Sequence, residues 1–539
     1  MSFVETGTHQ SRVLIDDSIV HSFSGKIKSF AQMLHFVHIF SSFRKCIALL
    51  LHILEQKRQG SFLKLIEWIN LYCFGTMFPL FLGSAGLAAL FSLGGIFFAN
   101  PRHTAACLFR NKSADKDYSP MRAMCLALAG TLGVGNIVGV AVALRLGGSG
   151  AVFWMWVSAF ATMPLKFCEI VLSIDCQRKR KGKEGAPVLY GGPMYYIRKK
   201  WGTAAGGAFC VLCICASFCG NLVQMRAVSE AARDVFSLPR RAVGVAIFLG
   251  ICVLIFGGRN RISGFTARVI PLCTAFYVLL CCAALLCLRG ALREAFCSIF
   301  RGIFTLKSAA GGIGGFLCLG AMRHGIAKGV YSHEAGCGTA PISYAGTKRT
   351  ELLRSGFLGI AEVFVDTVLL CTLTALVLLC AFPQGQGSDS SLFTVCNAFS
   401  GALGAWASYA VAAMVILFAF STVVCWSFYG MECLRYFCGR RTLLQGYCFL
   451  FCALGGLAVF WDTGNVWELS DFCTVLMALL NTGCLLTYLP VIRGITKTAL
   501  FTAAGNPRAK NTRRHGASPA ASFQPRSHSA PKNGSARQG

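Results

Sequence analysis

The sequence predicts an all-α membrane protein whose helices cross the bilayer about eleven times. Hydrophobic residues make up 55% of the 539-residue chain, its mean hydropathy is +0.59, and charged residues make up only 14%. Apolar stretches of about twenty residues, the length that crosses a bilayer as a helix, recur along the chain. Short polar loops separate these stretches. A single membrane domain therefore explains the pattern better than several soluble domains.

The apolar stretches define the expected organisation of the chain. The expected spans are residues 72–98, 122–145, 151–174, 204–230, 242–257, 268–288, 308–328, 356–382, 404–430, 444–461 and 471–492. They lie in a transmembrane domain at 66–495. Before it, residues 1–65 form an N-terminal extension that we expect to be interfacial or poorly ordered. After it, residues 496–539 are rich in Ser, Pro, Arg and Lys and contain no acidic residue, which predicts a disordered basic tail.

Charge and cysteine content exclude other classes of function. The formal net charge is +29, but the basic residues lie between apolar runs and in the tail, which fits the positive-inside rule better than nucleic-acid binding. The loop at 175–203 is strongly basic, whereas those at 383–403 and 462–470 contain no Lys or Arg. This bias places the C-terminus in the cytoplasm and the N-terminus outside. The 28 cysteines occur mostly inside apolar runs and act as small buried hydrophobes, so no disulfides are implied.

Two of the expected spans contain glycine clusters that interrupt a helix. One follows Gly130 in the second span, and the other covers 311–315 in the seventh. Each glycine weakens a helix by about 1 kcal/mol relative to alanine. Backbone groups freed by unwinding must find partners in the bilayer, and a ligand carboxylate or a cation can supply them. Close helix packing is the alternative role for such glycines.

The positions of the two clusters favour a binding site. They lie five spans apart, as expected for an inverted repeat in which one half covers about 122–288 and the other about 308–492. Ser421 and Thr422 are adjacent hydroxyls in an apolar span and suit Na⁺, although such hydroxyls often bond back to their own helix. Asn221 and Gln224 can bind a ligand amine or join helices.

A few charged residues lie within the expected spans. Lys166 and Glu169 belong to the third span, and Glu362 and Asp366 lie one turn apart in the eighth. Such residues are candidates for a functional role, and pairing with loop Lys or Arg is the alternative. No constellation of nucleophile, acid and base appears, so we expect a protein that is not an enzyme.

Several motifs resemble the alanine/glycine:cation symporter family, over roughly 70–495. They are the stretch from Gly130 to Val140 with Gly147–Trp156, the run Gly191–Tyr196, the pair Ser332–Gly336 and Gly338–Pro341, the pair Asp366–Thr367 and Cys371–Ala375, and the stretches Leu417–Tyr429 and Met477–Asn481. The resemblance implies a leucine-transporter-like fold of two inverted five-helix repeats with one extra N-terminal helix. It also implies Na⁺-driven uptake of alanine or glycine across the cell (inner) membrane.

The resemblance also implies which residues bind. The substrate carboxylate would meet the backbone at Val134 and Gly135, its side chain would face Ile313, and Trp426 would help close the pocket. The full predicted substrate site is Thr131, Val134, Gly135, Asn136, Gln224, Gly312, Ile313, Gly314 and Trp426. The predicted Na⁺ site is Ala129, Leu132, Phe418, Ser421 and Thr422. No cofactor is expected beyond Na⁺ as the coupling ion.

The sequence departs from the family pattern at four positions. Ser149 and Leu480 stand where proline is usual, His333 where asparagine is usual, and Ile313 where an aromatic residue is common. The first three lie away from the proposed Na⁺ ligands, whereas Ile313 bears on pocket size. The function expected is Na⁺-coupled symport by alternating access, in a monomer or weak oligomer. The alternative is a proton-coupled or broader-specificity permease of the same fold.

Overall fold

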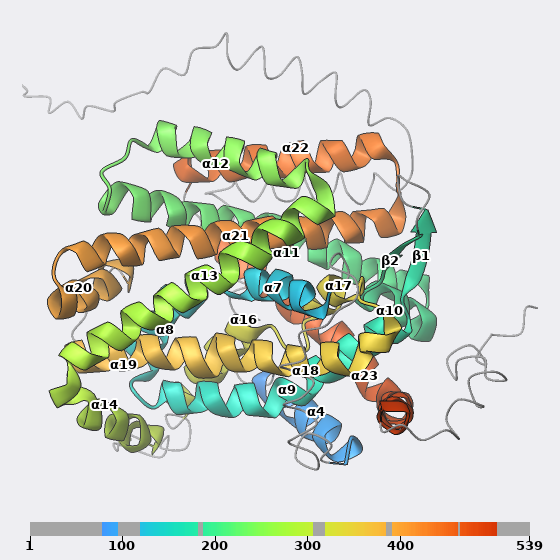
Figure 1. The fold of residues 1–539 in the computed structure, drawn as a ribbon, viewed down its shortest axis with the longest axis horizontal. Helices are drawn as coiled ribbons and strands as arrows, with labels where there is room; N and C mark the ends of the chain where they lie inside the picture. The colour runs from blue at the N-terminus through green and yellow to red at the C-terminus, as the bar shows by residue number, and fades with distance from the viewer. Residues whose placement is uncertain are drawn as a thin grey trace, which may run out of the picture. The chain divides into compact units, whose positions relative to one another are not determined.

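The structure is a computed structural model that describes residues 78–94, 119–181, 187–304, 319–383, 391–461 and 464–503. The chain divides into two units, Met1–Gln59 and Gly60–Gly539, and all the described residues belong to the second. The expected N-terminal extension at 1–65 lies outside the described residues, as does the glycine cluster at 311–315. Within the described ranges, helices account for nearly all regular structure, as the sequence predicts (Figure 1).

The helices follow the expected spans in order. The first half of the chain contains α4 (Phe78–Ser92), α7 (Pro120–Thr131), η2 (Val134–Asn136), α8 (Val138–Gly147), α9 (Ala151–Asp175), α10 (Pro193–Trp201), α11 (Thr203–Asp234), α12 (Arg240–Ile255), α13 (Gly258–Cys287), α14 (Arg289–Arg301) and η3 (Gly302–Phe304). The second half contains α16 (Leu319–His333), α17 (Ala340–Tyr344), η4 (Arg349–Glu351), α18 (Leu352–Val363), η5 (Phe364–Cys371), α19 (Thr372–Ala381), α20 (Ser391–Leu403), α21 (Trp406–Phe437), α22 (Arg441–Leu457), η6 (Ala458–Phe460) and α23 (Gly464–Ala503).

Seven helical segments among the described residues are long and apolar enough to cross a membrane. They are Ala151–Asp175, Thr203–Asp234, Gly258–Cys287, Arg349–Ala381, Trp406–Phe437, Arg441–Phe460 and Val466–Leu500. The helices α4, α8 and α20 are apolar but shorter. The second expected span is divided between α7 and α8, and the seventh lies partly outside the described residues. The expected count of eleven therefore stays a prediction.

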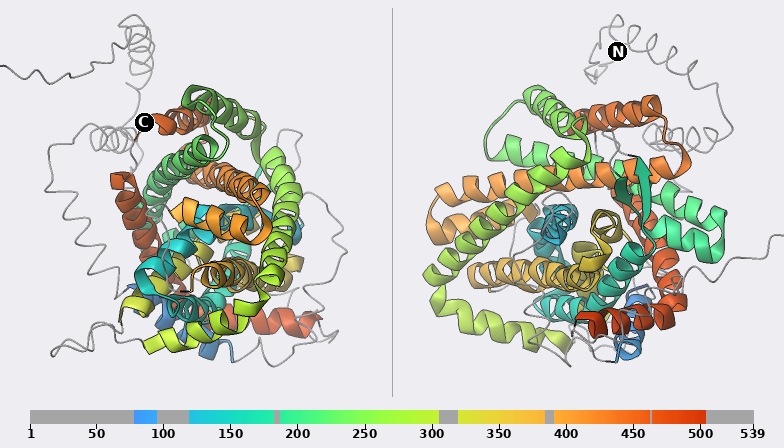
Figure 2. Two further views of the ribbon diagram at one scale, coloured as in Figure 1. Left: turned by 90° about the vertical axis from the view of Figure 1, so that its left-hand side faces the viewer. Right: turned by 45° about the vertical axis from the view of Figure 1, so that its right-hand side comes forward.

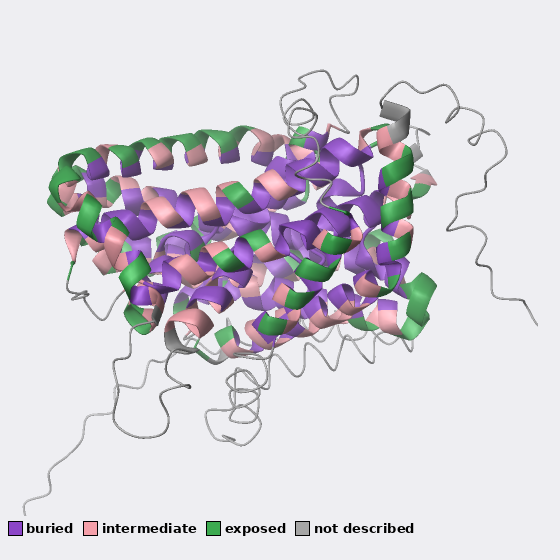
Figure 3. Cartoon of the chain, turned by 90° about the horizontal axis from the view of Figure 1, so that it is seen from below, coloured by how far each residue is buried: buried purple, intermediate pink, exposed green. Residues whose placement is uncertain are grey.

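Burial separates the inner helices from the outer ones. In the apolar windows of α9 and α21, 78% of residues are buried, against 33% in α13. The side chains of Leu272, Leu279 and Leu286 on α13 are about 70% exposed. Figure 3 shows the buried residues concentrated inside the helix bundle. Because exposing leucine side chains to water is unfavourable, this face of α13 suits contact with lipid.

Packing brings segments that are distant in sequence side by side. The helix α11 packs against α21, α9 packs against α16 and α18, and α12 packs against α22 (Figures 1 and 2). Glycines make the contact between α9 and α18 close. A Cβ atom at Gly356 would lie 2.6 Å from the ring of Phe167, and one at Gly359 would lie 2.2 Å from Ile170. This approach sets Lys166 on α9 beside Glu362 on α18.

Several boundaries differ from the sequence-based expectation. The helix α13 begins at Gly258, ten residues before the expected start at 268, because its polar first turn is held by Arg259, which donates to the carbonyl of Leu189 (2.9 Å). The helix α23 continues to Ala503, past the expected domain boundary at 495. The expected loops also contain helices α10, α14 and α20. A two-stranded antiparallel sheet joins β1 (Arg178–Lys181) to β2 (Pro187–Tyr190), with Arg178 opposite Tyr190.

Candidate substrate and cation site

The second expected span is interrupted, as its glycine cluster predicts. The helix α7 ends at Thr131, and the backbone turns extended at Leu132 (ψ 90°) and Gly133 (φ −132°, ψ −155°). The short 3₁₀ helix η2 follows, and α8 begins at Val138. The chain therefore crosses this region as two half-helices joined by irregular backbone.

Side chains take over the backbone groups that the interruption frees. In a continuous helix, the amide of Gly133 would donate to Ala129 and that of Val134 to Gly130. Instead, the Gly133 amide donates to Oδ1 of Asn136 (3.2 Å), and the Val134 amide donates to Oε1 of Gln224 (3.3 Å). Specific hydrogen bonds thus stabilise the interruption, and one of them comes from Gln224 on α11.

The carbonyl oxygens of the interruption turn toward α21. The oxygen of Gly130 accepts from Nε1 of Trp426 (3.3 Å), and that of Leu132 accepts from Oγ1 of Thr422 (3.0 Å). The indole of Trp426 also packs edge-on against Tyr429, with 5.7 Å between ring centroids. The helix α21 therefore lies against the irregular backbone along two of its turns.

The middle of the interruption is exposed at one residue. Gly135 is exposed although its neighbours Val134 and Asn136 are buried, and a Cβ atom at Gly135 would meet no described residue within 4 Å. An exposed glycine in the middle of an otherwise buried segment leaves the main chain accessible to a ligand. Gln224 is half-buried beside it and holds the preceding amide.

Oxygen atoms converge where α21 meets the interruption. The single hydroxyl of Thr422 lies within hydrogen-bond distance of two carbonyl oxygens, those of Leu132 (3.0 Å) and Phe418 (2.9 Å). The Ser421 hydroxyl donates to the same Phe418 oxygen (2.8 Å). Two hydroxyl hydrogens serve the two carbonyl oxygens, and the two hydroxyl oxygens can accept as well. Uncharged oxygens at this spacing suit a hard cation such as Na⁺.

The structure brings together most of the residues that the sequence singled out. Leu132, Phe418, Ser421 and Thr422 form the oxygen cluster just described. Ala129 is fully buried on the preceding turn, and the amide that would bond its carbonyl in a continuous helix is diverted to Asn136. Among the described residues, no group of three His, Cys, Asp or Glu side chains is placed to hold a metal ion. A cation here would therefore be held by carbonyls and hydroxyls.

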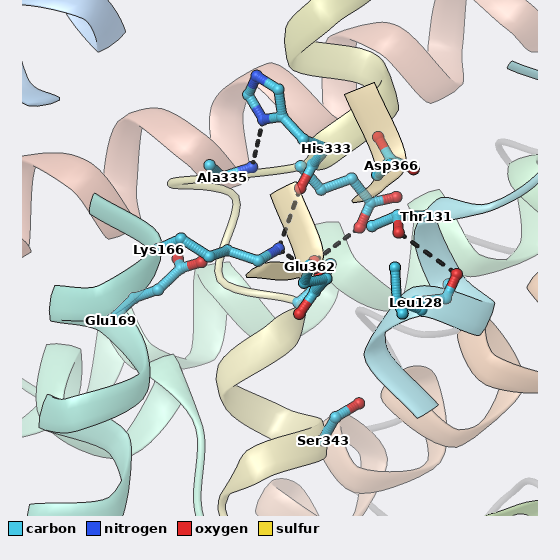
Figure 4. Close-up of polar contacts among 12 residues, drawn as sticks. Leu128, Thr131, Lys166, Glu169, His333, Ala335, Ser343, Glu362 and Asp366 are labelled. Carbon is cyan, nitrogen blue, oxygen red and sulfur yellow. Dashed lines mark hydrogen bonds and ion pairs between the residues drawn. The ribbon is translucent and has the colours of Figure 1, made fainter. Parts of the chain in front are cut away.

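The predicted substrate residues have different surroundings. Val134, Gly135, Gln224 and Trp426 lie at the interruption. The Thr131 hydroxyl donates back to the carbonyl of Leu128 (3.3 Å), the bond typical of a helix hydroxyl (Figure 4). Both ends of the Asn136 amide are bonded within the protein. Gly312, Ile313 and Gly314 lie outside the described residues.

A hydrogen-bond network around the Asp366 carboxylate stabilises the end of the interruption at Asn136. In the sequence, Asp366 was visible only as a charged residue within an expected span. The carboxylate of Asp366 is fully buried and accepts from Nδ2 of Asn136 (2.8 Å), Oγ of Ser332 (2.5 Å) and Oγ1 of Thr367 (2.8 Å). Asp366 lies in η5, a π-helical segment of eight residues. Such segments are rare and occur often at functional sites. Asp366 thus links the interruption to α16 and to the π-helix.

A second buried network surrounds Lys166. Its ammonium group pairs with Oε1 of Glu362 (2.9 Å) and donates to the carbonyl of His333 (3.0 Å) (Figure 4). Lys166 and Glu362 are both fully buried. The partner of Glu362 is therefore another intramembrane residue and not a loop Lys or Arg. Sequence spacing reveals contacts between residues three or four apart on one helix. Lys166 and Glu362 lie on different helices, so their contact was not predictable from spacing.

Glu169 ties a third group of elements together. Its Oε2 accepts from Nδ2 of Asn481 on α23 (2.9 Å) and from the Gly338 amide (3.2 Å). The hydroxyl of Tyr196 on α10 donates to Oδ1 of the same asparagine (2.5 Å). Tyr196, Gly338 and Asn481 fall within motifs that carried the family resemblance, whereas Glu169 stood out in the sequence as a charged residue within an expected span.

Long buried helices, one of them interrupted at its centre beside a cluster of carbonyl and hydroxyl oxygens, define the class as a multi-pass membrane transporter. The particular family follows from comparison with known proteins. The profile of the sodium:alanine symporter family matches residues 59–505, and the chain belongs to that family. It is thus an amino-acid symporter by family.

Relatives cover most of the chain. The sodium/alanine symporter AgcS of Methanococcus maripaludis is 31% identical over 464 residues, which cover 84% of this chain and 99% of AgcS. An uncharacterized transporter of Haemophilus influenzae is 31% identical over 438 residues, covering 80% of this chain and 95% of that protein. Among solved structures, MhsT in complex with L-phenylalanine is 13% identical, with a TM-score of 0.40 and coverage of 71% and 98%. That score is too low to define the fold.

Proposed function

We propose that the protein is a Na⁺-coupled symporter of small neutral amino acids, with alanine and glycine as its substrates, in the cytoplasmic membrane. The observation that carries the proposal is the oxygen cluster of Leu132, Phe418 and Thr422 beside the accessible backbone of Gly135. A cation and a zwitterion bound side by side make binding of each favour the other. The name of the relative AgcS supports the same choice of ion and substrate.

The open space at Gly135 supports a small substrate. An amino-acid carboxylate at this point would meet main-chain groups, and the positive end of a half-helix favours negative charge. The residues proposed to bind it are Val134, Gly135 and Gln224, with Trp426 closing the pocket. By the inverted-repeat hypothesis, the segment at 311–315 supplies the opposite wall. Alternating access would then expose the site to each side of the membrane in turn.

The test is uptake of labelled alanine by the full chain in proteoliposomes. We expect uptake to require an inward Na⁺ gradient and to fall to the leak rate when K⁺ replaces Na⁺. Replacing both Ser421→Ala and Thr422→Val should raise the half-saturating Na⁺ concentration by about tenfold or more, because two ligand oxygens are lost. Equal uptake with and without the gradient would remove the coupling claim.

A matched control separates ligand loss from damage to the helix. Ser427 lies on the same helix, is fully buried, and donates only to the carbonyl of Val424 (2.6 Å). The variant Ser427→Ala should therefore keep the wild-type Na⁺ dependence. A change in Na⁺ dependence as large as that of the double variant would show that packing in α21, and no ion site, underlies the effect.

Proton coupling is the second candidate, and buried charge favours it. Four carboxyl groups, those of Glu169, Glu334, Glu362 and Asp366, lie buried around the single ammonium of Lys166. The neighbouring imidazole of His333 accepts from the amide of Ala335 through Nδ1 (3.0 Å), so that nitrogen carries no proton and the ring is neutral. Buried carboxyl groups in excess of cations are protonated, hold a cation, or rely on hydrogen-bond donors as Asp366 does. Alanine uptake driven by an inward proton gradient in Na⁺-free buffer would establish this candidate instead.

A further inference from the structure

A small polar pocket lies at the start of α7, away from the oxygen cluster. It is partly open to solvent. Its lining consists of Ser119, Arg122, Ala123, Leu126, Arg259, Ser263, Ser343, Gly346 and Thr347. We call it the inner pocket. Two of these residues carry guanidinium groups and none is acidic, so the lining contributed by described residues is positively charged and rich in hydroxyls.

The guanidinium of Arg259 is held in place at the inner pocket. Its Nη1 donates to the carbonyl of Leu189 on β2 (2.9 Å), and the group lies over the ring of Phe428 at 5.7 Å from the centroid. It also lies directly against Gly346, where a Cβ atom would overlap Nη2 at 1.7 Å. A cation fixed by three neighbours loses little side-chain freedom on binding an anion, which is the usual cost of recruiting arginine.

Thr347 supplies an independent sign of a missing ligand. Its side chain is 1% exposed, yet its hydroxyl has no hydrogen-bond partner among the described residues. A buried hydroxyl left without a partner costs about 1–3 kcal/mol. The inner pocket also lies at the N-terminus of α7, where Ser119 is the N-cap and makes no capping bond. A helix N-terminus attracts negative charge. The guanidinium groups, the Thr347 hydroxyl and the N-terminus of α7 would all stabilise an anionic group bound in the inner pocket.

A single aromatic residue connects the inner pocket to the interruption. The hydroxyl of Ser343, which lines the pocket, donates to the hydroxyl of Tyr429 (3.1 Å). The same Tyr429 hydroxyl lies 3.0 Å from where a Cβ atom of Gly130 would be, at the last turn before the interruption. Tyr429 thus stands between the two sites, and α7 runs from one to the other.

We propose that the inner pocket is a second carboxylate site, which receives the transported amino acid after it leaves the interruption on its way to the cytoplasm. The inference rests on the proposed function and adds a release step to it. Arg259 and Arg122 attract the carboxylate, the Thr347 hydroxyl donates to it, and Tyr429 moves aside to let it pass. The basic residues of β1 and α10 predict that this end of the protein faces the cytoplasm.

The test compares the two faces of the membrane. Labelled-alanine transport by the full chain is measured in right-side-out and inside-out vesicles. Arg259→Gln should raise the cytoplasmic-face KM for alanine about tenfold, and Thr347→Val about threefold, with the external-face KM unchanged. Thr347→Val removes a hydroxyl that has no partner, so its unfolding midpoint should not fall. An unchanged cytoplasmic-face KM in both variants, with normal wild-type transport, would overturn the inner pocket alone.

Controls separate the proposal from its alternatives. Arg261 lies on the same helix as Arg259 but is exposed, lies outside the pocket lining, and donates to the carbonyl of Val253 (2.8 Å), so Arg261→Gln should leave both KM values unchanged. If the effect of Arg259→Gln appears with phosphatidylglycerol and vanishes in pure phosphatidylcholine, the occupant is a lipid phosphate and the proposal is wrong. If the wild type fails to transport alanine at either face, the proposed function itself fails.

Discussion

Two regions of the protein depart from the α-helix in opposite ways. Between α7 and α8 the chain unwinds, its amides turn to side chains, and Gly135 remains open to space. Between α18 and α19 the chain widens into the π-helix η5, and its carboxylate at Asp366 is fully buried and bonded to three donors. The two regions touch through Asn136. The first is accessible at Gly135, and the second is buried.

Substitutions in the two regions should therefore affect stability and binding differently. In the closed region, the Asp366 carboxylate accepts from three donors, so removal of the carboxylate or of a donor leaves a buried polar group without its partner. In the open region, a Cβ atom at Gly135 would meet no described residue, so we expect a substitution there to cost little in folding and to act on the proposed substrate. The loss of stability should be largest at the buried charges and smallest at Gly135.

The largest loss is expected for Lys166→Met. The change leaves the Glu362 carboxylate buried without its partner at 2.9 Å, which typically costs about 3–5 kcal/mol. The measurement is the unfolding midpoint of the purified full chain in detergent. Adding Glu362→Gln to the variant should recover much of the loss, since an amide carries no charge. If the single and double variants unfold together at the wild-type midpoint, the pair does not stabilise the fold.

A smaller loss is expected for Asp366→Asn. The new amide turns hydrogens toward side chains that already donate, Asn136 among them, and about 1–3 kcal/mol of stability is lost. Alanine uptake should fall as well, because Asn136 also holds the Gly133 amide. The variant Thr367→Val removes only one of the three donors and should retain most of the uptake. If Asp366→Asn and Thr367→Val reduced alanine uptake equally, the Asp366 carboxylate would matter no more than one of its donors.

The smallest loss of stability is expected for Gly135→Ala. A Cβ atom there meets no described residue within 4 Å, so the free energy of unfolding should change by no more than about 0.5 kcal/mol. Alanine uptake should nevertheless fall sharply, because the methyl group occupies the proposed substrate space. The matched control is Gly139→Ala, one turn further along, where a Cβ atom likewise meets none of the residues that the structure describes within 4 Å. Equal uptake by both variants would place the substrate elsewhere.

The sequence predicts the open region much better than the closed one. Glycine at 130, 133 and 135 is a local signal, and the interruption appears where these residues predict it. The π-helix η5 has no comparable signal, since the run Phe364–Cys371 contains neither glycine nor proline. Lys166 and Glu362 are visible as intramembrane charges, but their pairing depends on how α9 packs on α18. Contacts between helices of this kind are fixed by tertiary packing and leave no trace in spacing.

Helix ends were the least predictable feature of the fold. The polar start of α13, with Arg259, Asn260 and Arg261, reads as a loop in sequence, but β2 supplies a carbonyl for Arg259 and the helix begins there. The hydrogen-bonded oxygens at Thr422 were predictable in part. Their residue types were predicted, whereas their distance from Leu132 follows from the crossing of α21 over the interruption.

The hydrogen bonds of the Asn481 side chain suggest a way to observe motion in this transporter. Its amide joins Tyr196 and Glu169, and also donates to the carbonyl of Gly336 (2.9 Å), so α23 is fastened to α9 and α10 near its middle. The same helix then continues without a break to Ala503. A rigid domain grafted in helical register after that residue would act as a lever arm, and its tilt would report displacements of α9 that are too small to follow directly.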